Sequence, residues 1–293
     1  MKTNTSLDLA SFSAIALALA FSAGTASASN AASDTASNYS SGGWGLTPPN
    51  NGSGFGPWTV MTFNANNPPY VGTYLSTGSA VNSGGYAWGT YANGGTSDGN
   101  VHLFRPFTVD GSGYQDPSTL GTLNSQTFSV SLSSAGIGNG SGGPPGSALG
   151  FQLATGQNFN TASTALYLVY RGTSATDNMY IWDNNTGVET PVAVTFAELN
   201  AGITVSVAVG NNPDGLNPYT LTVSPFTGGS PYAIFNGAEN GPLQAVDLFD
   251  FNTTGDGFFN NLNITPELIP EPSGLALFGL SGLALLFRLR RRS

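Results

Sequence analysis

The chain has no cysteine, one histidine and very little positive charge. Zero cysteines among 293 residues exclude disulfide bonds, thiol catalysis and lipoprotein acylation, so the folded protein depends on its core alone. A Ser-His-Asp site, or most zinc sites, would have to use the single histidine, His102. The seven basic residues are Lys2, Arg105, Arg171, Arg288, Arg290, Arg291 and Arg292.

The charge is distributed unevenly along the chain. Between Ser29 and Ile269 there are 14 acidic residues and two arginines, which gives a net charge of −12. A surface so poor in cations cannot neutralise phosphates, so we expect no nucleic-acid binding and no attraction to anionic lipid. The whole chain is 40% hydrophobic and 11% aromatic, which is sufficient to bury a core and argues against a disordered acidic tail.

The N-terminus has the pattern of a secretory signal peptide. Lys2 precedes an apolar stretch from Phe12 to Ala23, and Ala26-Ser27-Ala28 then supplies a cleavage pattern of small residues. The alternative is a short buried helix, but the Ala/Ser-rich sequence after the apolar stretch fits cleavage better. We therefore predict an exported protein with a signal peptide over residues 1–28, in which Ala26 and Ala28 are the two small residues of the cleavage site.

Residues 29–54 and 55–265 differ in pattern. The first segment is rich in Ser, Asn and Gly, so we expect it to be flexible, with Trp44 as its one residue that docks on the domain. The second consists of short runs rich in Val, Thr, Tyr and Phe, which are typical of strands. The predicted strands are Trp58–Asn64, Tyr86–Tyr91, Val101–Val109, Thr127–Leu132, Ala165–Tyr170, Met179–Trp182, Val188–Val194, Ile203–Val209, Tyr219–Val223, Val246–Phe251 and Phe258–Ile264.

The connections contain Asn, Asp and Gly, as tight turns do. MYIW–DNNTG–VETPV, LFDF–NTTGDG–FFNN and ITVSVAVG–NNPDGLNP–YTLTV each predict a hairpin. Thr195 and Glu198 form a capping box that predicts one short helix, and Asp116–Leu120 predicts a second helical turn. Many short strands with such turns favour an all-β sandwich or barrel over a βαβ fold.

Residues 55–265 resemble the concanavalin A/laminin-G-like jelly rolls. The resemblance rests on AWGTYANG, VHLFRPFTV, QTFSVSL, LGFQL and VDLFDFNTTGDGFFNNLNI. It implies a jelly-roll-type β-sandwich ectodomain. It does not imply a function, because a fold of this kind carries many functions.

The carboxylates argue against a glycosidase. Laminarinase-like members of this fold class carry Glu-x-Asp-x-x-Glu along one strand, and this run is absent. Among the glutamates of the middle region, Glu239 is the one without a local explanation, and it has no carboxylate neighbour in sequence. His102 fits a partly exposed strand residue. We therefore expect that the protein has no catalytic residue and is not an enzyme. The alternative is a carbohydrate-active enzyme, either a glycoside hydrolase or a lyase.

Two other sets of residues have a functional and a structural interpretation. Asp250, Asn252, Thr254 and Asp256 alternate as calcium ligands do, but the twelfth position is Asn261 and the flanks are strands, so we expect no cofactor and keep calcium as the alternative. Trp44, Trp58, Trp88 and Trp182 would suit sugar stacking if exposed, although tryptophan in a sandwich usually lies in the core. We expect the two middle arginines, Arg105 and Arg171, to pair with carboxylates.

The C-terminus differs from the rest of the chain. Pro270-Glu271-Pro272 prevents a helix interior, and the residues from Ser273 to Phe287 carry no charge. A helix over 273–289 is close to the lower limit for crossing a bilayer, and Arg288, Arg290, Arg291 and Arg292 follow as a cytoplasmic stop-transfer cluster. A buried core helix, the alternative, would not be apolar on every face and then end in arginines.

Pro270-Glu271-Pro272, the Gly/Leu-rich span and the terminal arginines together resemble a PEP-CTERM sorting signal over residues 266–293. The resemblance implies recognition by a membrane exosortase, cleavage near the Pro-Glu-Pro motif, and an association with exopolysaccharide or biofilm. It implies a single-pass inner-membrane intermediate with the ectodomain outside, and then a protein at the cell surface or in the extracellular matrix. We therefore expect a non-enzymatic surface or matrix protein whose partners are exosortase, the membrane and exopolysaccharide.

Overall fold

The computed structural model describes residues 31–40, 44–63, 71–92, 99–110, 121–137, 147–172, 178–212, 215–253 and 255–266. All of these belong to one unit, Ser29–Glu267. The predicted signal peptide, the helical turn at Asp116–Leu120 and the C-terminal sorting signal beyond Pro266 lie outside the described residues. Within the ranges given above, no helix is long and apolar enough to cross a membrane.

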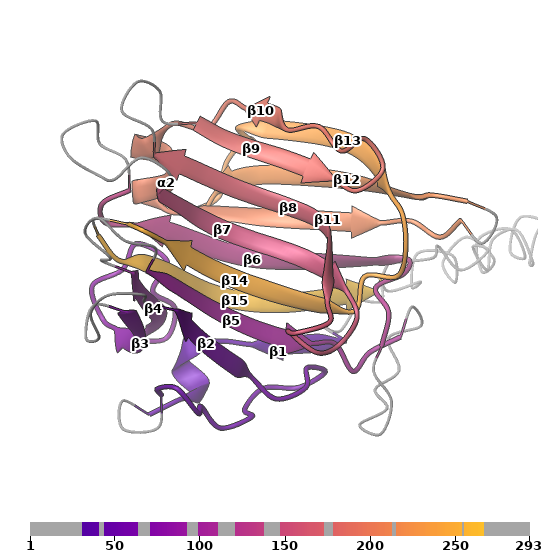
Figure 1. Ribbon diagram of the computed structural model, residues 1–293. Coiled ribbons are helices and arrows are strands. Elements are labelled where there is room, and N and C mark those ends of the chain that lie inside the picture. Colours follow the sequence, from indigo (N-terminus) through magenta and orange to yellow (C-terminus); the bar gives the residue numbers. More distant parts are fainter. Residues whose placement is uncertain are drawn as a thin grey trace, which may run out of the picture. The chain divides into compact units, whose positions relative to one another are not determined.

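The described strands form two antiparallel sheets that stack face to face (Figure 1). The eight-stranded sheet has the order β13 (Ala233–Glu239), β12 (Asn217–Pro225), β11 (Ile203–Val209), β6 (Gln126–Ser134), β15 (Gly257–Pro266), β4 (Ala87–Ala92) and β3 (Val71–Ser76), and β1 (Ala32–Asp34) also pairs with β15. The seven-stranded sheet has the order β10 (Thr190–Val192), β9 (Asn178–Asp183), β8 (Ser163–Gly172), β7 (Ser147–Thr155), β14 (Ala245–Phe251), β5 (Asn100–Pro106) and β2 (Thr59–Phe63). The predicted all-β sandwich is confirmed, and each predicted strand overlaps an observed one.

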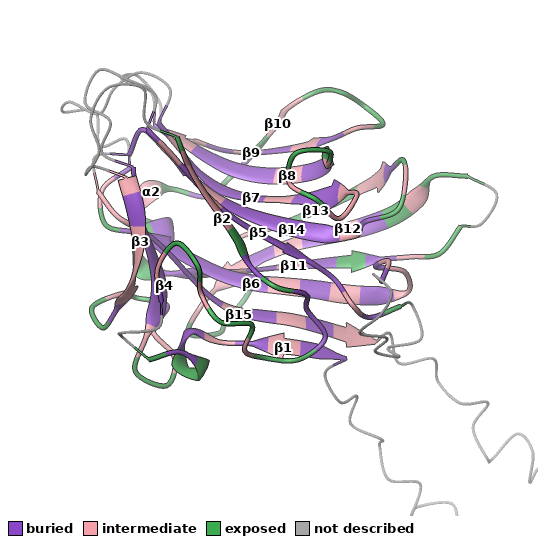
Figure 2. Cartoon of the chain, turned by 60° about the horizontal axis from the view of Figure 1, so that its bottom comes forward, coloured by how far each residue is buried: buried purple, intermediate pink, exposed green. Residues whose placement is uncertain are grey.

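Alternation of residue type along the strands places the core between the sheets. On β11, Ile203, Val205, Val207 and Val209 are buried, whereas the side chains between them are half-buried or exposed. Each such buried side chain contributes about 1.5–3 kcal/mol relative to an exposed one. Figure 2 shows the buried residues along the strands and the exposed residues mainly in the connections.

Two short helical segments accompany the sheets, α2 (Phe196–Ala201) and the 3-10 turn η1 (Ala36–Asn38). The predicted capping box is present, because the Thr195 hydroxyl accepts from the Glu198 amide and the Glu198 carboxylate accepts from the Thr195 amide. Each interaction pairs a backbone amide that the first helical turn leaves free.

Two of the three predicted hairpins are confirmed, and one is wrong. β9 pairs with β10 and β11 pairs with β12, but β14 and β15 belong to different sheets. At the end of β14, the Asn252 amide donates to the Gly99 carbonyl at 2.9 Å and the Asn252 side chain accepts from the Gly99 amide at 3.0 Å. These bonds lie beside the β14–β5 pairing within the seven-stranded sheet. Because β15 belongs to the eight-stranded sheet, the Asn/Gly-rich connection leads from one sheet to the other and does not form a hairpin.

The prediction of a flexible segment over residues 29–54 is wrong for its described part. β1 pairs with β15, and Tyr39 and Trp44 are buried in the core, the latter as expected. Small residues make this docking possible, because Ala32 and Ala36 are completely buried against the sandwich. The small residues that suggested a flexible segment therefore allow it to pack closely on the sandwich.

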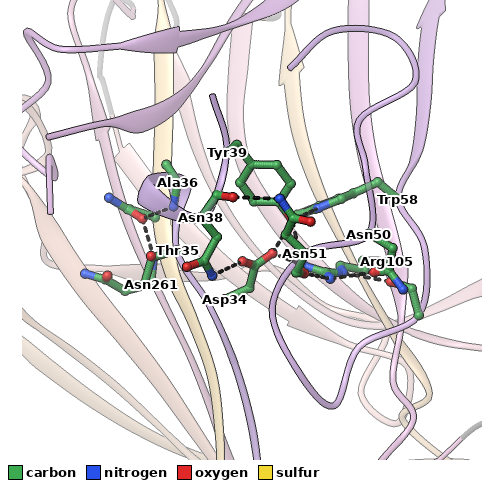
Figure 3. A network of polar contacts seen from close by, with 12 residues as sticks. Asp34, Thr35, Ala36, Asn38, Tyr39, Asn50, Asn51, Trp58, Arg105 and Asn261 are labelled. Atoms are coloured by element: carbon green, nitrogen blue, oxygen red, sulfur yellow. Dashed lines mark hydrogen bonds and ion pairs between the residues drawn. The ribbon is translucent and has the colours of Figure 1, made fainter. Parts of the chain in front are cut away.

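A buried ion pair connects this N-terminal segment to the seven-stranded sheet (Figure 3). The Arg105 guanidinium bonds Asp34 Oδ2, and it also donates to the carbonyls of Gly56 at 2.9 Å and Asn51 at 2.6 Å. Asp34 accepts in addition from the Tyr39 hydroxyl at 2.5 Å. Both charged side chains are completely buried, so the predicted structural pairing of Arg105 is confirmed.

Candidate functional site

The outer face of the seven-stranded sheet contains a groove centred on β7. The side chains of Leu149, Phe151 and Leu153 point into the core, which leaves Ala148, Gly150 and Gln152 facing outward. The register places Gly150 between Val169 of β8 and Phe249 of β14, so a small residue has larger neighbours on both sides. The groove has a volume of about 360 Å³ and is lined by Asn100, His102, Ala148, Gln152, Thr164, Tyr167, Val169, Arg171, Phe249 and Phe251.

A polar network occupies one part of the groove. Asp247 is completely buried, and its Oδ2 accepts from Gln152 Nε2 at 2.8 Å and lies 2.8 Å from His102 Nδ1. Thr164 Oγ1 in turn donates to Gln152 Oε1 at 2.6 Å. A carboxylate only accepts, so a hydrogen bond to it requires the proton of His102 on Nδ1, and Nε2 is then the ring nitrogen that does not face Asp247. Asp247 Oδ1 has no hydrogen-bond partner within the described part of the chain.

The β8 side of the groove carries Arg171, the second of the two arginines between Ser29 and Ile269. Arg171 forms two contacts with Glu189, at 2.7 Å to Oε2 and 2.5 Å to Oε1, which confirms its predicted pairing with a carboxylate. The Tyr167 hydroxyl also donates to Glu189 Oε1. Burial, together with the hydrogen bond and charge of Glu189, raises the pKa of Tyr167 to about 12. This tyrosine is therefore a neutral hydroxyl at physiological pH.

Aromatic rings flank the polar groups. Trp182 of β9 stacks on Tyr167 with ring centroids 5.3 Å apart and planes inclined by 12°. On the β5 side, the centroid of the His102 ring lies 6.2 Å from that of Phe249 and 5.1 Å from that of Phe159. The groove thus combines flat apolar rings with oriented amide, hydroxyl and imidazole groups.

The four tryptophans divide between core and surface. Trp44, Trp58 and Trp88 belong to the buried core, where their rings contact one another and Tyr39. Trp182 is half-buried on the outer face, beside the groove. The core interpretation is therefore correct for three of the four.

Glu239 has a structural explanation that its sequence neighbours do not reveal. It is completely buried at the end of β13, and its Oε1 accepts from Asn217 Nδ2 at 2.9 Å. Burial raises the pKa of Glu239 to about 7, with Asp183 adding to the rise and Asn217 opposing it. Asp183 accepts from the Tyr219 hydroxyl at 2.8 Å, which connects β9 to β12. A carboxylate enclosed in this way does not line the groove.

The described residues of the segment kept as the alternative calcium loop use their side-chain oxygens within the protein. Asp250 is completely buried and accepts from Thr90 Oγ1 at 2.9 Å and Thr253 Oγ1 at 2.6 Å. Asn252 accepts from the Gly99 amide, and Asp256 accepts from the Tyr74 hydroxyl. Thr254 lies outside the described residues. Where the structure describes the chain, it contains no group of three or more acidic, His or Cys side chains placed to hold a metal.

No protein-family model matches this chain, and no curated protein matches it. The globular domain of T. cruzi calreticulin matches at 11% identity with a TM-score of 0.43, over 78% of this chain and 95% of that one. Lectin II from Ulex europaeus matches at 11% identity and a TM-score of 0.38, over 81% and 99%. The endo-beta-1,4-glucuronan lyase from Trichoderma reesei matches at 9% and 0.39, over 70% and 94%. Such distant similarities transfer no ligand or activity, so the site has to be interpreted from its own residues.

Proposed function

We propose that this chain is an exported, non-enzymatic surface or matrix protein that binds extracellular polysaccharide in the groove of its seven-stranded sheet. The observation that carries the proposal is the composition of the groove, in which planar polar groups are held in place between aromatic rings. An apolar lining with a few oriented polar groups is typical of small-molecule binding sites.

Sugar chemistry matches this arrangement. A pyranose ring presents C–H groups on its faces and hydroxyls around its rim, so it packs on an aromatic ring while its hydroxyls bond polar side chains. In the groove, Phe249 and Tyr167 offer ring surface. Gln152, Thr164 and His102 Nε2 offer donors and acceptors for hydroxyls, and the Asp247 network holds them in fixed orientations.

The opposite face of the sandwich provides a contrast. A depression of about 390 Å³ on the eight-stranded sheet is lined largely by small uncharged side chains, among them Thr127, Ala208, Thr220 and Asn236. The one aromatic residue in its lining, Tyr219, is buried and directs its hydroxyl to Asp183. This depression lacks the ring surface that sugar stacking needs, so variants there are suitable controls.

Replacing Gln152 by Ala tests the proposal. Loss of its amide removes one or two hydrogen bonds to a sugar and loosens the Asp247 network, so binding to the preferred polysaccharide should weaken about tenfold. Affinity electrophoresis against a panel of polysaccharides measures this, with Asn236→Ala on the other face as the matched polar control. Equal binding by both variants, or no retention of the wild type on any polysaccharide, contradicts the proposal.

The C-terminal signal supports a proposal about processing. Residues 266–293 have the layout of a PEP-CTERM segment, so we expect export, a membrane intermediate and cleavage by exosortase near Pro270-Glu271-Pro272, followed by release or attachment at the surface. Mass spectrometry of the mature protein tests this. A C-terminus still at Ser293 in cells that contain an exosortase contradicts it.

A carbohydrate-active enzyme is the second candidate, and one observation favours it. His102 is oriented by the buried Asp247, and its second ring nitrogen is free to take a proton, as a general base requires. Such an enzyme would produce new reducing ends or unsaturated products from a bound polysaccharide, and His102→Gln would abolish them. Binding without any product on prolonged incubation excludes this candidate for the polysaccharide tested.

A further inference from the structure

Every positively chargeable side chain in the described residues is paired with a carboxylate. Arg105 lies in the interior against Asp34, Arg171 binds Glu189, and His102 binds Asp247. The sequence holds no other lysine or arginine between Ser29 and Ile269, so the remaining connections of this region add none. A ligand that enters the groove therefore meets no free cation.

The carboxylates of these pairs would oppose an acidic ligand. Asp247 bonds Gln152, which lines the groove, and Glu189 bonds Tyr167 and Arg171, which also line it. Binding of a uronate carboxylate beside them is disfavoured in two ways. The carboxylate gives up its hydration, and it is repelled by the like charges, more strongly where the local dielectric constant is low. At longer range, the net charge of −12 between Ser29 and Ile269 repels a polyanion.

We infer that the groove selects uncharged polysaccharide over polymers that carry uronate, and that Glu189 sets this selectivity by neutralising Arg171. The inference rests on the proposed function and specifies its ligand class. Neutral sugar hydroxyls make use of Gln152, Thr164 and His102 without requiring a counter-charge. Arg171, with 38% of its side chain exposed, is the permanently charged cation in the groove lining, and an acidic sugar would reach it if Glu189 no longer paired with it.

Glu189→Gln is the decisive variant. Glutamine keeps the shape of the side chain and an acceptor for the Tyr167 hydroxyl, but it no longer cancels the charge of Arg171. The matched control is Glu198→Gln, which changes the net charge equally in an exposed capping box that accepts either residue. The probes are a panel of neutral glucans, mannans and galactans, and polygalacturonate as the uronate polymer.

We expect the wild type and Glu198→Gln to bind a neutral polymer and to bind polygalacturonate only weakly. Glu189→Gln should bind polygalacturonate about tenfold more tightly than the wild type, as a released arginine–carboxylate contact implies. That gain should fall with added salt, whereas neutral binding by the wild type should not change. Retained neutral binding and an unchanged thermal melt verify that the variant is folded.

The outcomes separate this inference from the proposed function. Wild-type binding to polygalacturonate equal to or tighter than to neutral polymers overturns the selectivity and leaves polysaccharide binding in place. Salt-sensitive neutral binding by the wild type, which needs no variant, also contradicts it. A folded Glu189→Gln without any gain for polygalacturonate overturns the role of Glu189. Failure of the wild type to bind either class removes the proposed function itself.

Discussion

Removal of Arg105 should destabilise the sandwich far more than removal of Arg171. Both arginines pair with a carboxylate, but the Arg105–Asp34 pair is completely buried, whereas the side chains of Arg171 and Glu189 are 38% and 30% exposed. Arg105→Met leaves the Asp34 carboxylate buried with fewer donors, and it leaves the carbonyls of Gly56 and Asn51 without the guanidinium. The two substitutions are therefore a matched comparison of a buried and an exposed ion pair.

The magnitude follows from burial. Breaking a buried pair costs about 3–5 kcal/mol, whereas an exposed pair is worth about 0–1 kcal/mol. At about 2–4 °C per kcal/mol for a domain of this size, Arg105→Met should lower the Tm by roughly 6–20 °C. Arg171→Met should change the Tm by no more than about 4 °C by the same conversion.

Thermal and urea unfolding of the full chain measure both effects. Asp34→Asn in the Arg105→Met background removes the stranded charge while the Tyr39 hydroxyl keeps an acceptor, so the double variant should regain part of the lost stability. Equal destabilisation by Arg105→Met and Arg171→Met would refute the reasoning. A double variant that is no more stable than Arg105→Met would show that the buried charge is not the cause.

Three further predictions concern Glu239, Asn260 and calcium. The folded-state pKa of Glu239 is raised from 4.5 to about 7, so its charge destabilises the fold increasingly from about pH 4.5 to 7. Glu239→Gln should therefore gain on the order of 3 kcal/mol above pH 7 and nothing below pH 4.5, measured as Tm against pH with Glu198→Gln as control. Asn260 donates to the Val81 and Tyr86 carbonyls and accepts from the Ala36 amide. Asn260→Ala should therefore lower the free energy of unfolding by about 2–4 kcal/mol, measured by urea unfolding. EDTA should leave the Tm within about 1 °C, and a larger fall would restore the calcium loop as a binding site.

The sequence predicts strands best where residue types alternate regularly. Ile203–Val209 is predicted with its observed bounds because every second residue is apolar and buried. β1 and β7 are missed, and so are β3 and β13, which glycine interrupts, since glycine weakens a strand prediction. In the fold these glycines make room for a ring from the neighbouring strand, Tyr91 over Gly72 and Tyr219 over Gly237. Such compensation depends on a partner strand that local sequence does not identify.

The groove is harder to predict than the strands. The pairing of Arg171 with a carboxylate follows from charge balance, but the choice of Glu189 depends on the positions of β8 and the segment that leads into β10. His102 and Asp247 lie 145 positions apart in sequence and meet only because β5 and β14 are neighbours in the same sheet. The sequence signal for the groove is the presence of polar residues within otherwise apolar strands. That pattern does not show which strands are neighbours in the sheet.

The affinity of the purified chain for a neutral polysaccharide, with and without an intact groove, tests the central claim most directly. Isothermal titration of the wild type should give saturable binding, and the double variant Gln152→Ala/Tyr167→Ala, which loses hydrogen bonds and ring surface together, should bind about a hundredfold more weakly or not at all. Binding of undiminished affinity by this variant, with its thermal unfolding showing an intact fold, would contradict the assignment of the groove as the polysaccharide site.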